Sequence, residues 1–139
     1  DVNILLQQAL GRTPPPEGVP IEPHLASGLP SVKVDADQLF HALENILAYE
    51  YATPSEGGSL RLLTRVGGDE VYIEFIDSGP GLEKEKLASL FDAQRDDGLT
   101  SLRIPLLAAR CLASLNHGRL EAESRVGIGT RLSLVFPCA

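Results

Sequence analysis

A run of apolar residues at helical spacing between Asp35 and Tyr51 constrains the fold of this chain more than any other stretch. Asp35 is a good N-cap, and Gln38 follows three residues later in a capping-box pattern. This is the clearest helix of the sequence. Its buried face is predicted to consist of residues that recur every three or four positions, namely Leu39, Ala42, Leu43, Ile46 and Leu47.

Two hairpin patterns supply most of the predicted strands. Residues 59–66 and 70–76 carry apolar side chains at alternating positions and are separated by a short glycine-containing turn. Residues 119–124 and 131–136 are predicted as a second pair of strands around another glycine-containing turn. We therefore expect two hairpins.

The remaining elements complete the predicted architecture. Residues 21–25 contain a proline, which favours an edge strand. Shorter helices are predicted at 2–10, 83–91 and 104–115, the last with Pro105 in its first turn, where proline is tolerated. The order of elements predicts an α+β, two-layer sandwich, in which helices cover one face of a mixed, mainly antiparallel sheet.

Length and charge limit the classes of function. A chain of 139 residues fits one domain with one core. Its net charge of -7 argues against a nucleic-acid partner, because binding phosphates requires a basic surface. The longest apolar stretch is shorter than the ~20 residues needed to cross a bilayer, so we expect no membrane contact by this domain. The start at Asp1 rather than at Met is expected of a piece of a longer protein.

The motif Asp77-Ser78-Gly79-Pro80-Gly81 follows a hydrophobic strand. It can be a simple turn. It can also recognise a base, because a carboxylate at a strand end accepts a hydrogen bond from an exocyclic amine. Glycines would let a flat ring approach the backbone. The motif alone leaves both interpretations open.

Two further motifs are ambiguous when taken singly. Asn45 lies in the helix 35–51, where a buried amide is costly unless it is hydrogen-bonded. It can equally lie on the solvated face. The segment from Gly127 to Thr130 lies between the last two predicted strands and needs no function as a hairpin turn.

Taken together, the motifs resemble the histidine-kinase ATPase family. This family has the Bergerat fold and belongs to a superfamily shared with gyrase, a heat-shock chaperone and the MutL repair protein. The resemblance extends from the first helix to the last strand. The matching segments, in the family's order, are Asn45, Asp77 to Gly81, Phe91, a lid at 95–102, a helix start at Arg103 to Leu106, and Gly127 to Thr130.

The resemblance implies a nucleotide-binding site. ATP or ADP would be the ligand, and the family also binds magnesium. Asp77 would hold adenine, and Asn45 would orient the phosphate site. The pocket would be shaped by Gly79, Gly81, Gly127, Gly129 and Thr130.

The resemblance also implies a biological role. A sensor histidine kinase transfers a phosphoryl group from ATP to a histidine on a separate helical dimerisation domain, and then to a response regulator. The domain would be cytoplasmic, including where it is part of a membrane-anchored kinase. Residues 1–20 would connect it to the upstream dimerisation and phosphoacceptor domain.

Two departures from the family pattern put catalysis in question. The family's helix reads N-x-x-x-N-A, and its second Asn binds magnesium. Four residues after Asn45 this chain has Tyr49, and a protonated phenol is a poor magnesium ligand. Glu50 is about 100° round the helix from Tyr49, which disfavours it as a substitute. The family's G-x-G-L helix start is replaced by a segment with Arg103 and Pro105, which lacks the open backbone that binds phosphate.

These departures leave two readings. In the first, the chain is the ATP-binding catalytic domain of a sensor histidine kinase. In the second, it is a docking module with weak or no nucleotide binding, which engages its own helical domain or a response regulator. A hydrolase of the gyrase or chaperone type is disfavoured, because those relatives have a Glu general base where this chain has Asn45. The sequence predicts that the adenine side is kept and the metal side is lost.

Overall fold

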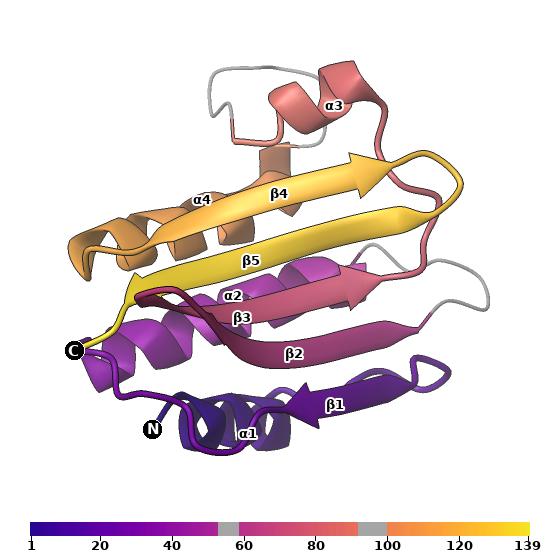
Figure 1. Ribbon diagram of the computed structural model, residues 1–139. Helices are drawn as coiled ribbons and strands as arrows, with labels where there is room; N and C mark the ends of the chain where they lie inside the picture. The colour runs from indigo at the N-terminus through magenta and orange to yellow at the C-terminus, as the bar shows by residue number, and fades with distance from the viewer. Residues whose placement is uncertain (53–58, 92–99) are drawn as a thin grey trace.

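The computed structural model describes residues 1–52, 59–91 and 100–139, and Figure 1 shows how they are arranged. The order of helices and strands is the one predicted from the sequence. In chain order the elements are α1 (Val2–Arg12), β1 (Ile21–Leu25), α2 (Ala36–Ala52), β2 (Leu60–Gly67), β3 (Glu70–Asp77), α3 (Lys84–Ala88), α4 (Thr100–Leu115), β4 (Arg119–Arg125) and β5 (Gly129–Pro137).

The strands in the described part of the chain form one five-stranded sheet in the order β1-β2-β3-β5-β4. β1 is parallel to β2, and the other neighbours are antiparallel. The pairing of β3 with β5 joins the two hairpins, with Ile76 opposite Arg131. As a result, the end of β3 and the start of β5 lie side by side, and this position contains the candidate site.

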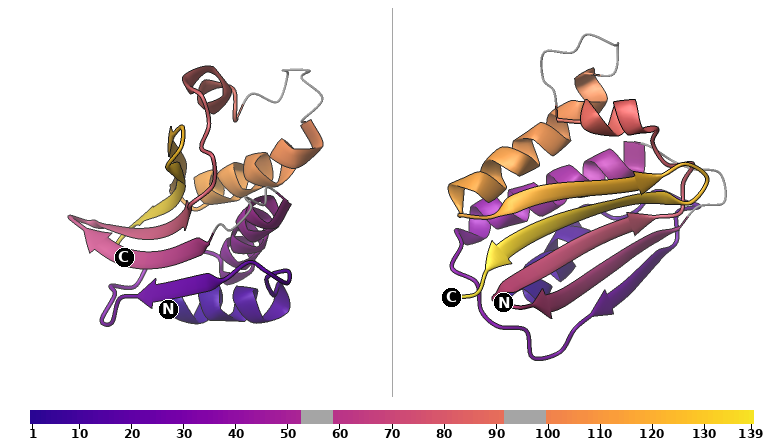
Figure 2. Two further views of the ribbon diagram at one scale, coloured as in Figure 1. Left: turned by 90° about the vertical axis from the view of Figure 1, so that its right-hand side faces the viewer. Right: turned by 45° about the horizontal axis from the view of Figure 1, so that its top comes forward.

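The helices α1, α2 and α4 cover one face of the sheet, as the two views of Figure 2 show. The short helix α3 lies apart from them, beyond the edge strand β4 (Figure 1). The predicted two-layer α+β sandwich with a mixed sheet is therefore confirmed. Within the described ranges, no helix combines the length and apolar character that a bilayer span requires.

The core lies between the sheet and its helices. Alternating strand residues such as Leu62, Ile73 and Phe75 are fully buried, as are the five residues predicted for the inner face of α2. Burying such a side chain contributes about 1.5–3 kcal/mol, so this contact is the main source of stability. α1 adds Leu6 and Ala9 to the same core. The proposed link from this helix to an upstream domain stays a prediction.

The opposite face of the sheet is covered by its own long side chains. Glu74 is only 3% exposed and pairs with Arg65 and with Arg131, the latter at 3.5 Å. The hydroxyl of Ser133 donates to Glu74 at 3.4 Å, and Arg65 stacks over the ring of Tyr72 at 3.8 Å. A buried carboxylate is tolerated when it is paired in this way.

The start of α4 differs from the prediction. The helix begins at Thr100, so Pro105 lies inside it and not in its first turn. Residues 100–103 look like part of a polar loop by composition. However, the Arg103 side chain is 5% exposed and donates to the Ser89 carbonyl at 3.4 Å, a long-range contact that no local pattern reveals. The prediction of a first-turn proline is therefore wrong.

α3 is shorter than the predicted helix at 83–91. It ends at Ala88, and Ser89 is its C-cap, whose N–H donates to the carbonyl of Glu85. The chain then turns, with the Leu90 N–H donating to the carbonyl of Leu87 at 3.2 Å. Phe91 therefore lies beyond the helix.

Candidate functional site

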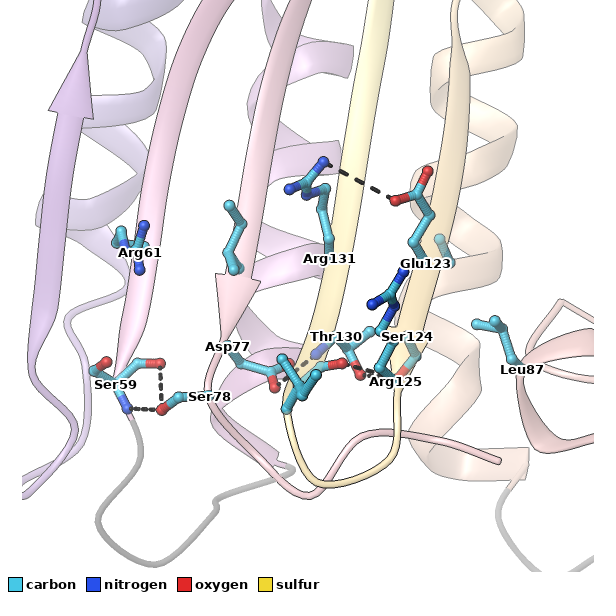
Figure 3. Close-up of a pocket in the computed structure, with 14 residues that line it drawn as sticks. Ser59, Arg61, Asp77, Ser78, Leu87, Glu123, Ser124, Arg125, Thr130 and Arg131 are labelled. Atoms are coloured by element: carbon cyan, nitrogen blue, oxygen red, sulfur yellow. Dashed lines mark hydrogen bonds and ion pairs between the residues drawn. The ribbon is translucent and has the colours of Figure 1, made fainter. Parts of the chain in front are cut away.

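Asp77 is the last residue of β3 and lies on the same sheet face as buried Phe75, toward the helices. Its Oδ1 accepts hydrogen bonds from the backbone N–H of Gly79 at 3.0 Å and of Thr130 at 3.2 Å. Figure 3 shows Asp77 and Thr130 together at the ends of their strands. Two backbone donors thus hold the carboxylate in one orientation and leave its other oxygen for a further donor.

The turn after Asp77 fits closely against the turn between β4 and β5. A Cβ on Gly129, whose φ is 143°, would lie 2.0 Å from the Asp77 carbonyl oxygen. A Cβ on Gly81, whose φ is 75°, would lie 2.1 Å from the Arg125 carbonyl oxygen. The Gly127 N–H donates to the Pro80 carbonyl at 2.7 Å. Gly81 and Gly129 are therefore required for the two turns to meet.

Ser124 links the same two turns through its hydroxyl. It accepts from the Leu82 N–H at 2.7 Å, donates to the Gly129 carbonyl at 3.1 Å, and lies 2.8 Å from the Thr130 hydroxyl. Sequence reasoning missed Ser124, because a serine near a strand end carries no distinctive pattern. The hydrogen bonds of Ser124 depend on the register of β4 and β5, which the sequence pattern does not give.

A hollow of about 640 Å³ borders these turns. Its lining includes Asp77, Gly129 and Thr130, three of the predicted site residues. Arg61 and Arg131 also line it, farther along their strands (Figure 3). Among the described residues that line the hollow, none belongs to α2.

Tyr49 and Glu50, near the end of α2, are each only 7% exposed. Burial raises the pKa of Glu50 well above its ordinary range, and the charge of Asp77 and a hydrogen bond to Asp77 raise it further. Burial also raises the pKa of Tyr49 to about 12, with added effects from the charges of Glu50 and Asp77. Burial and the nearby charge of Asp77 thus favour the neutral form of Glu50, and burial likewise favours the neutral phenol of Tyr49.

Asn45 lies one turn earlier on α2 and is half-buried. Its amide Nδ2 donates to the carbonyl of His41 at 2.9 Å, within the same helix. Asn45 does not line the hollow beside Asp77. The structure thus places Asp77, Gly129 and Thr130 around one hollow that Asn45 does not line, and the role of Asn45 at a phosphate site stays a prediction.

The segment predicted to replace the phosphate-binding helix start lies one turn inside α4. Arg103 is buried and donates to the carbonyl of Ser89, which lies just after α3. Pro105 has no backbone N–H to offer a ligand. The predicted lid centre, residues 95–98, lies outside the described residues.

The comparison with protein families decides the family to which the chain belongs. Residues 34–139 match the model of the histidine kinase-, DNA gyrase B- and HSP90-like ATPases. The chain belongs to this family. The match covers most of the chain and includes every predicted site residue.

Curated relatives of the ATPase family with similar sequences are sensor proteins. The chain is 26% identical to the C4-dicarboxylate transport sensor protein DctS of Rhodobacter capsulatus, over 99% of this chain and 22% of that protein. It is 25% identical to the adaptive-response sensory kinase SasA of Crocosphaera subtropica, over 78% of this chain and 30% of that protein. The chain thus spans less than a third of the length of these relatives.

Solved histidine-kinase structures share the fold. The nucleotide-free catalytic domain of ThkA superposes with a TM-score of 0.81 at 15% identity, covering 99% of this chain and 94% of that chain. Full-length ShkA in complex with AMPPNP also gives a TM-score of 0.81, at 23% identity, covering 100% of this chain and 31% of that chain. The Bergerat-type ATPase fold is therefore established for this chain.

The residues present do not fit the magnesium ion that the ATPase family implies. Tyr49 stands at the position expected for the metal-binding Asn, and its buried, protonated phenol is a poor ligand for a hard cation. Across residues 1–52, 59–91 and 100–139, no three His, Cys, Asp or Glu side chains converge to hold a metal. We therefore derive no chemical step through magnesium.

Proposed function

We propose that this chain is the nucleotide-binding domain of a two-component sensor histidine kinase, with the base of ATP or ADP recognised at Asp77. The observation that carries the proposal is the fixed carboxylate at the end of β3. Its Oδ1 is held by two backbone N–H groups, which leaves an acceptor for an exocyclic amine. Membership of the ATPase family supports a nucleotide as the ligand.

In the whole protein, the phosphoryl group of ATP would pass to a histidine on a separate dimerisation domain and then to a response regulator. The sensor-protein relatives support this arrangement, since each is more than three times as long as the matched region. The three histidines of this chain lie in β1, in α2 and after α4. None of these places resembles an exposed phosphoacceptor on a helical bundle.

One set of observations favours the second reading, a docking module with weak nucleotide binding. Buried Tyr49 cannot serve magnesium, and the Asn45 amide is bonded within its own helix. Buried Arg103 bonds to a protein carbonyl. All three observations concern the residues predicted to bind the metal and the phosphates. The part of the site around Asp77 is unaffected by them.

Calorimetric titration with ADP and with Mg-ATP tests the proposal. We expect ADP to bind, and we expect Mg-ATP to bind no more tightly than ADP, because the metal contacts are missing. Failure to bind either nucleotide would favour the docking module. Clearly tighter, magnesium-dependent binding of ATP would show that the phosphate half is functional.

A further inference from the structure

One row of residues across the sheet has an arginine on either side of an apolar residue. The register places Arg61 of β2 opposite Ile76 of β3, and Ile76 opposite Arg131 of β5. All three adjoin buried residues of their own strands that face the helices, so their side chains point to the other face of the sheet. At the ends of the row, Glu22 is opposite Arg61 and Glu123 is opposite Arg131.

The two arginines are spaced so that one ligand can contact both. Figure 3 shows Arg61 and Arg131 on the two strands that flank β3. Neighbouring strands are about 4.7–4.9 Å apart, so the two side chains start roughly 10 Å from each other. An anion above half-buried Ile76 would lie between these long side chains.

The hollow of about 640 Å³ is lined by these three residues, and its volume is that of a small-molecule site. Arg125 adds a third guanidinium, and Gly129, opposite it in the register, has no side chain to cover it. Among the described residues that line the hollow, three arginines face two acids, Asp77 and Glu123. The hollow therefore concentrates positive charge on a chain whose net charge is -7.

The present partners of the two arginines can be replaced at small cost. Arg61 is 3.9 Å from Glu22, and both side chains are more than half exposed. Arg131 is 4.0 Å from exposed Glu123, and such exposed ion pairs contribute little. Arg131 is also 3.5 Å from buried Glu74. That acid has further contacts on the same face, so Arg131 can turn to an anion without leaving it unpaired.

We propose that this hollow binds a phosphate group of a small molecule, held above Ile76 by Arg61 and Arg131. A guanidinium is a planar fork of donors, and the several oxygens of a phosphate can accept from two forks at once. The phosphate can come from a nucleotide or from a separate phosphorylated small molecule. The inference goes beyond the proposed function, because it requires neither a base at Asp77 nor a metal.

The test uses inorganic pyrophosphate, which carries phosphate groups and no base. It is titrated calorimetrically, without magnesium, into the wild type, Arg61→Gln and Arg131→Gln. Arg119→Gln is the matched control. Arg119 lies on the same face, is as exposed as Arg131 and is also paired with acids, but it is not among the described residues that line the hollow.

We expect pyrophosphate to bind the wild type. Arg61→Gln and Arg131→Gln should each weaken it about tenfold or more, because each removes a charge-assisted contact. Arg119→Gln should bind like the wild type. Glu123→Gln should bind more tightly, since it removes a carboxylate that competes for Arg131. Thermal unfolding checks that each variant is folded, and Arg61→Gln decides alone if Arg131→Gln does not fold.

Adenosine and ADP identify the source of the phosphate. If a nucleotide supplies it, ADP should bind more tightly than adenosine, lose this advantage in Arg61→Gln and compete with pyrophosphate. If a separate small molecule supplies it, ADP and adenosine should bind alike, and pyrophosphate should still bind beside ADP.

The inference is overturned if the folded wild type does not bind pyrophosphate. It is also overturned if Arg119→Gln weakens binding as much as Arg61→Gln, because the attraction would then be spread over the surface. Failure of the proposed function gives a different result: neither adenosine nor ADP would bind through Asp77, whereas pyrophosphate would still depend on Arg61 and Arg131.

Discussion

The two oxygens of the Asp77 carboxylate have different tasks, and a substitution can separate them. Asp77→Asn keeps one oxygen that can accept from the N–H groups of Gly79 and Thr130, so the turn should survive. It replaces the other oxygen by an amide that repels an incoming amine. We expect ADP binding to weaken about 10- to 150-fold, which corresponds to about 1.5–3 kcal/mol.

This prediction is checked by calorimetric titration of ADP into the wild-type chain and into Asp77→Asn. Thermal unfolding of Asp77→Asn serves as the control for folding. Unchanged affinity in a folded Asp77→Asn would remove this residue from the base site.

Glu50 should also give the chain a pH-dependent stability. Its folded pKa is raised, mainly by burial and then by Asp77, whereas in the unfolded chain it returns to the ordinary value of 4.5. Above that pH the unfolded chain loses the proton while the folded chain keeps it. Stability from this group is therefore complete below pH 4.5 and is lost as pH rises toward the folded pKa.

Glu50→Gln removes this titration, so its Tm relative to the wild type should increase steadily from pH 4.5 upward. The raised pKa of Tyr49, about 12, acts only at far higher pH. The measurement is thermal unfolding of both proteins from pH 4.5 to about pH 8. Glu17→Gln, at an exposed position, is the matched control. A constant Tm difference would contradict a protonated Glu50.

At the scale of elements, α4 ends in a strained residue. His117 has φ 62°, a left-handed conformation that favours glycine. The N–H of Gly118 donates to the carbonyl of Ala113 at 2.8 Å, and that of His117 to the carbonyl of Ser114 at 3.2 Å, as in a Schellman motif. The preceding Asn116 accepts from the Asp35 N–H and donates to Gln38, which ties this end of α4 to the start of α2.

His117→Gly should therefore stabilise the chain by about 0.4–1 kcal/mol, or a rise of about 2–4 °C in Tm. The gain is limited because glycine also increases the entropy of the unfolded chain. Chemical denaturation measures the effect. His117→Asn should give a smaller gain, since Asn tolerates this conformation better than most residues. A loss of stability in His117→Gly would show that the imidazole makes a compensating contact.

Element boundaries show what the sequence can predict. Regular patterns gave α2 and its N-cap correctly, since Gln38 donates to Asp35 Oδ1 at 3.0 Å as the capping box requires. The start of α4 could not be predicted in this way. It depends on the burial of Arg103 against the Ser89 carbonyl, a contact between residues in different elements.

The candidate site shows the same difference between features that local sequence patterns predict and features that depend on three-dimensional packing. Asp77 and the glycines belong to contiguous motifs, so the sequence identified them. Glu50 was disfavoured as a metal ligand because of its angle to Tyr49 on the helix, and its proximity to Asp77 was missed. Its only signal in the sequence is a carboxylate beside the apolar face of α2. This carboxylate can be linked to Asp77 only when the packing of α2 on β3 is known.

At the scale of the whole molecule, the metal and phosphate half of the site depends on two elements that are distant in sequence. α2 supplies Tyr49, and the first turns of α4 supply Arg103 and Pro105. Contacts to one shared ligand are coupled, so restoring only one element should have little effect. The proposed defect is therefore best tested by changing both elements together.

We expect Tyr49→Asn, Arg103→Gly and Pro105→Gly together to give magnesium-dependent ATP binding. The new Asn places an amide oxygen where the metal is expected, the glycines remove two side chains from the first turns of α4, and Pro105→Gly regains a backbone N–H. Arg103→Gly also removes the buried contact to Ser89 and adds a helical glycine, which costs about 1 kcal/mol in propensity alone. We therefore expect a lower Tm, and folding is confirmed by the thermal transition before titration.

The comparison that matters is the ratio of ADP to Mg-ATP affinity in the full combination, in each single variant and in the wild type. Only the full combination should prefer Mg-ATP, because α2 and α4 must contact the same ligand at once. If the full combination folds and binds ADP but does not respond to magnesium, the defect extends beyond these residues. The whole phosphate-binding surface would then have diverged. The hypothesis of a docking module would explain the features that the fold retains better than the hypothesis of a catalytic domain.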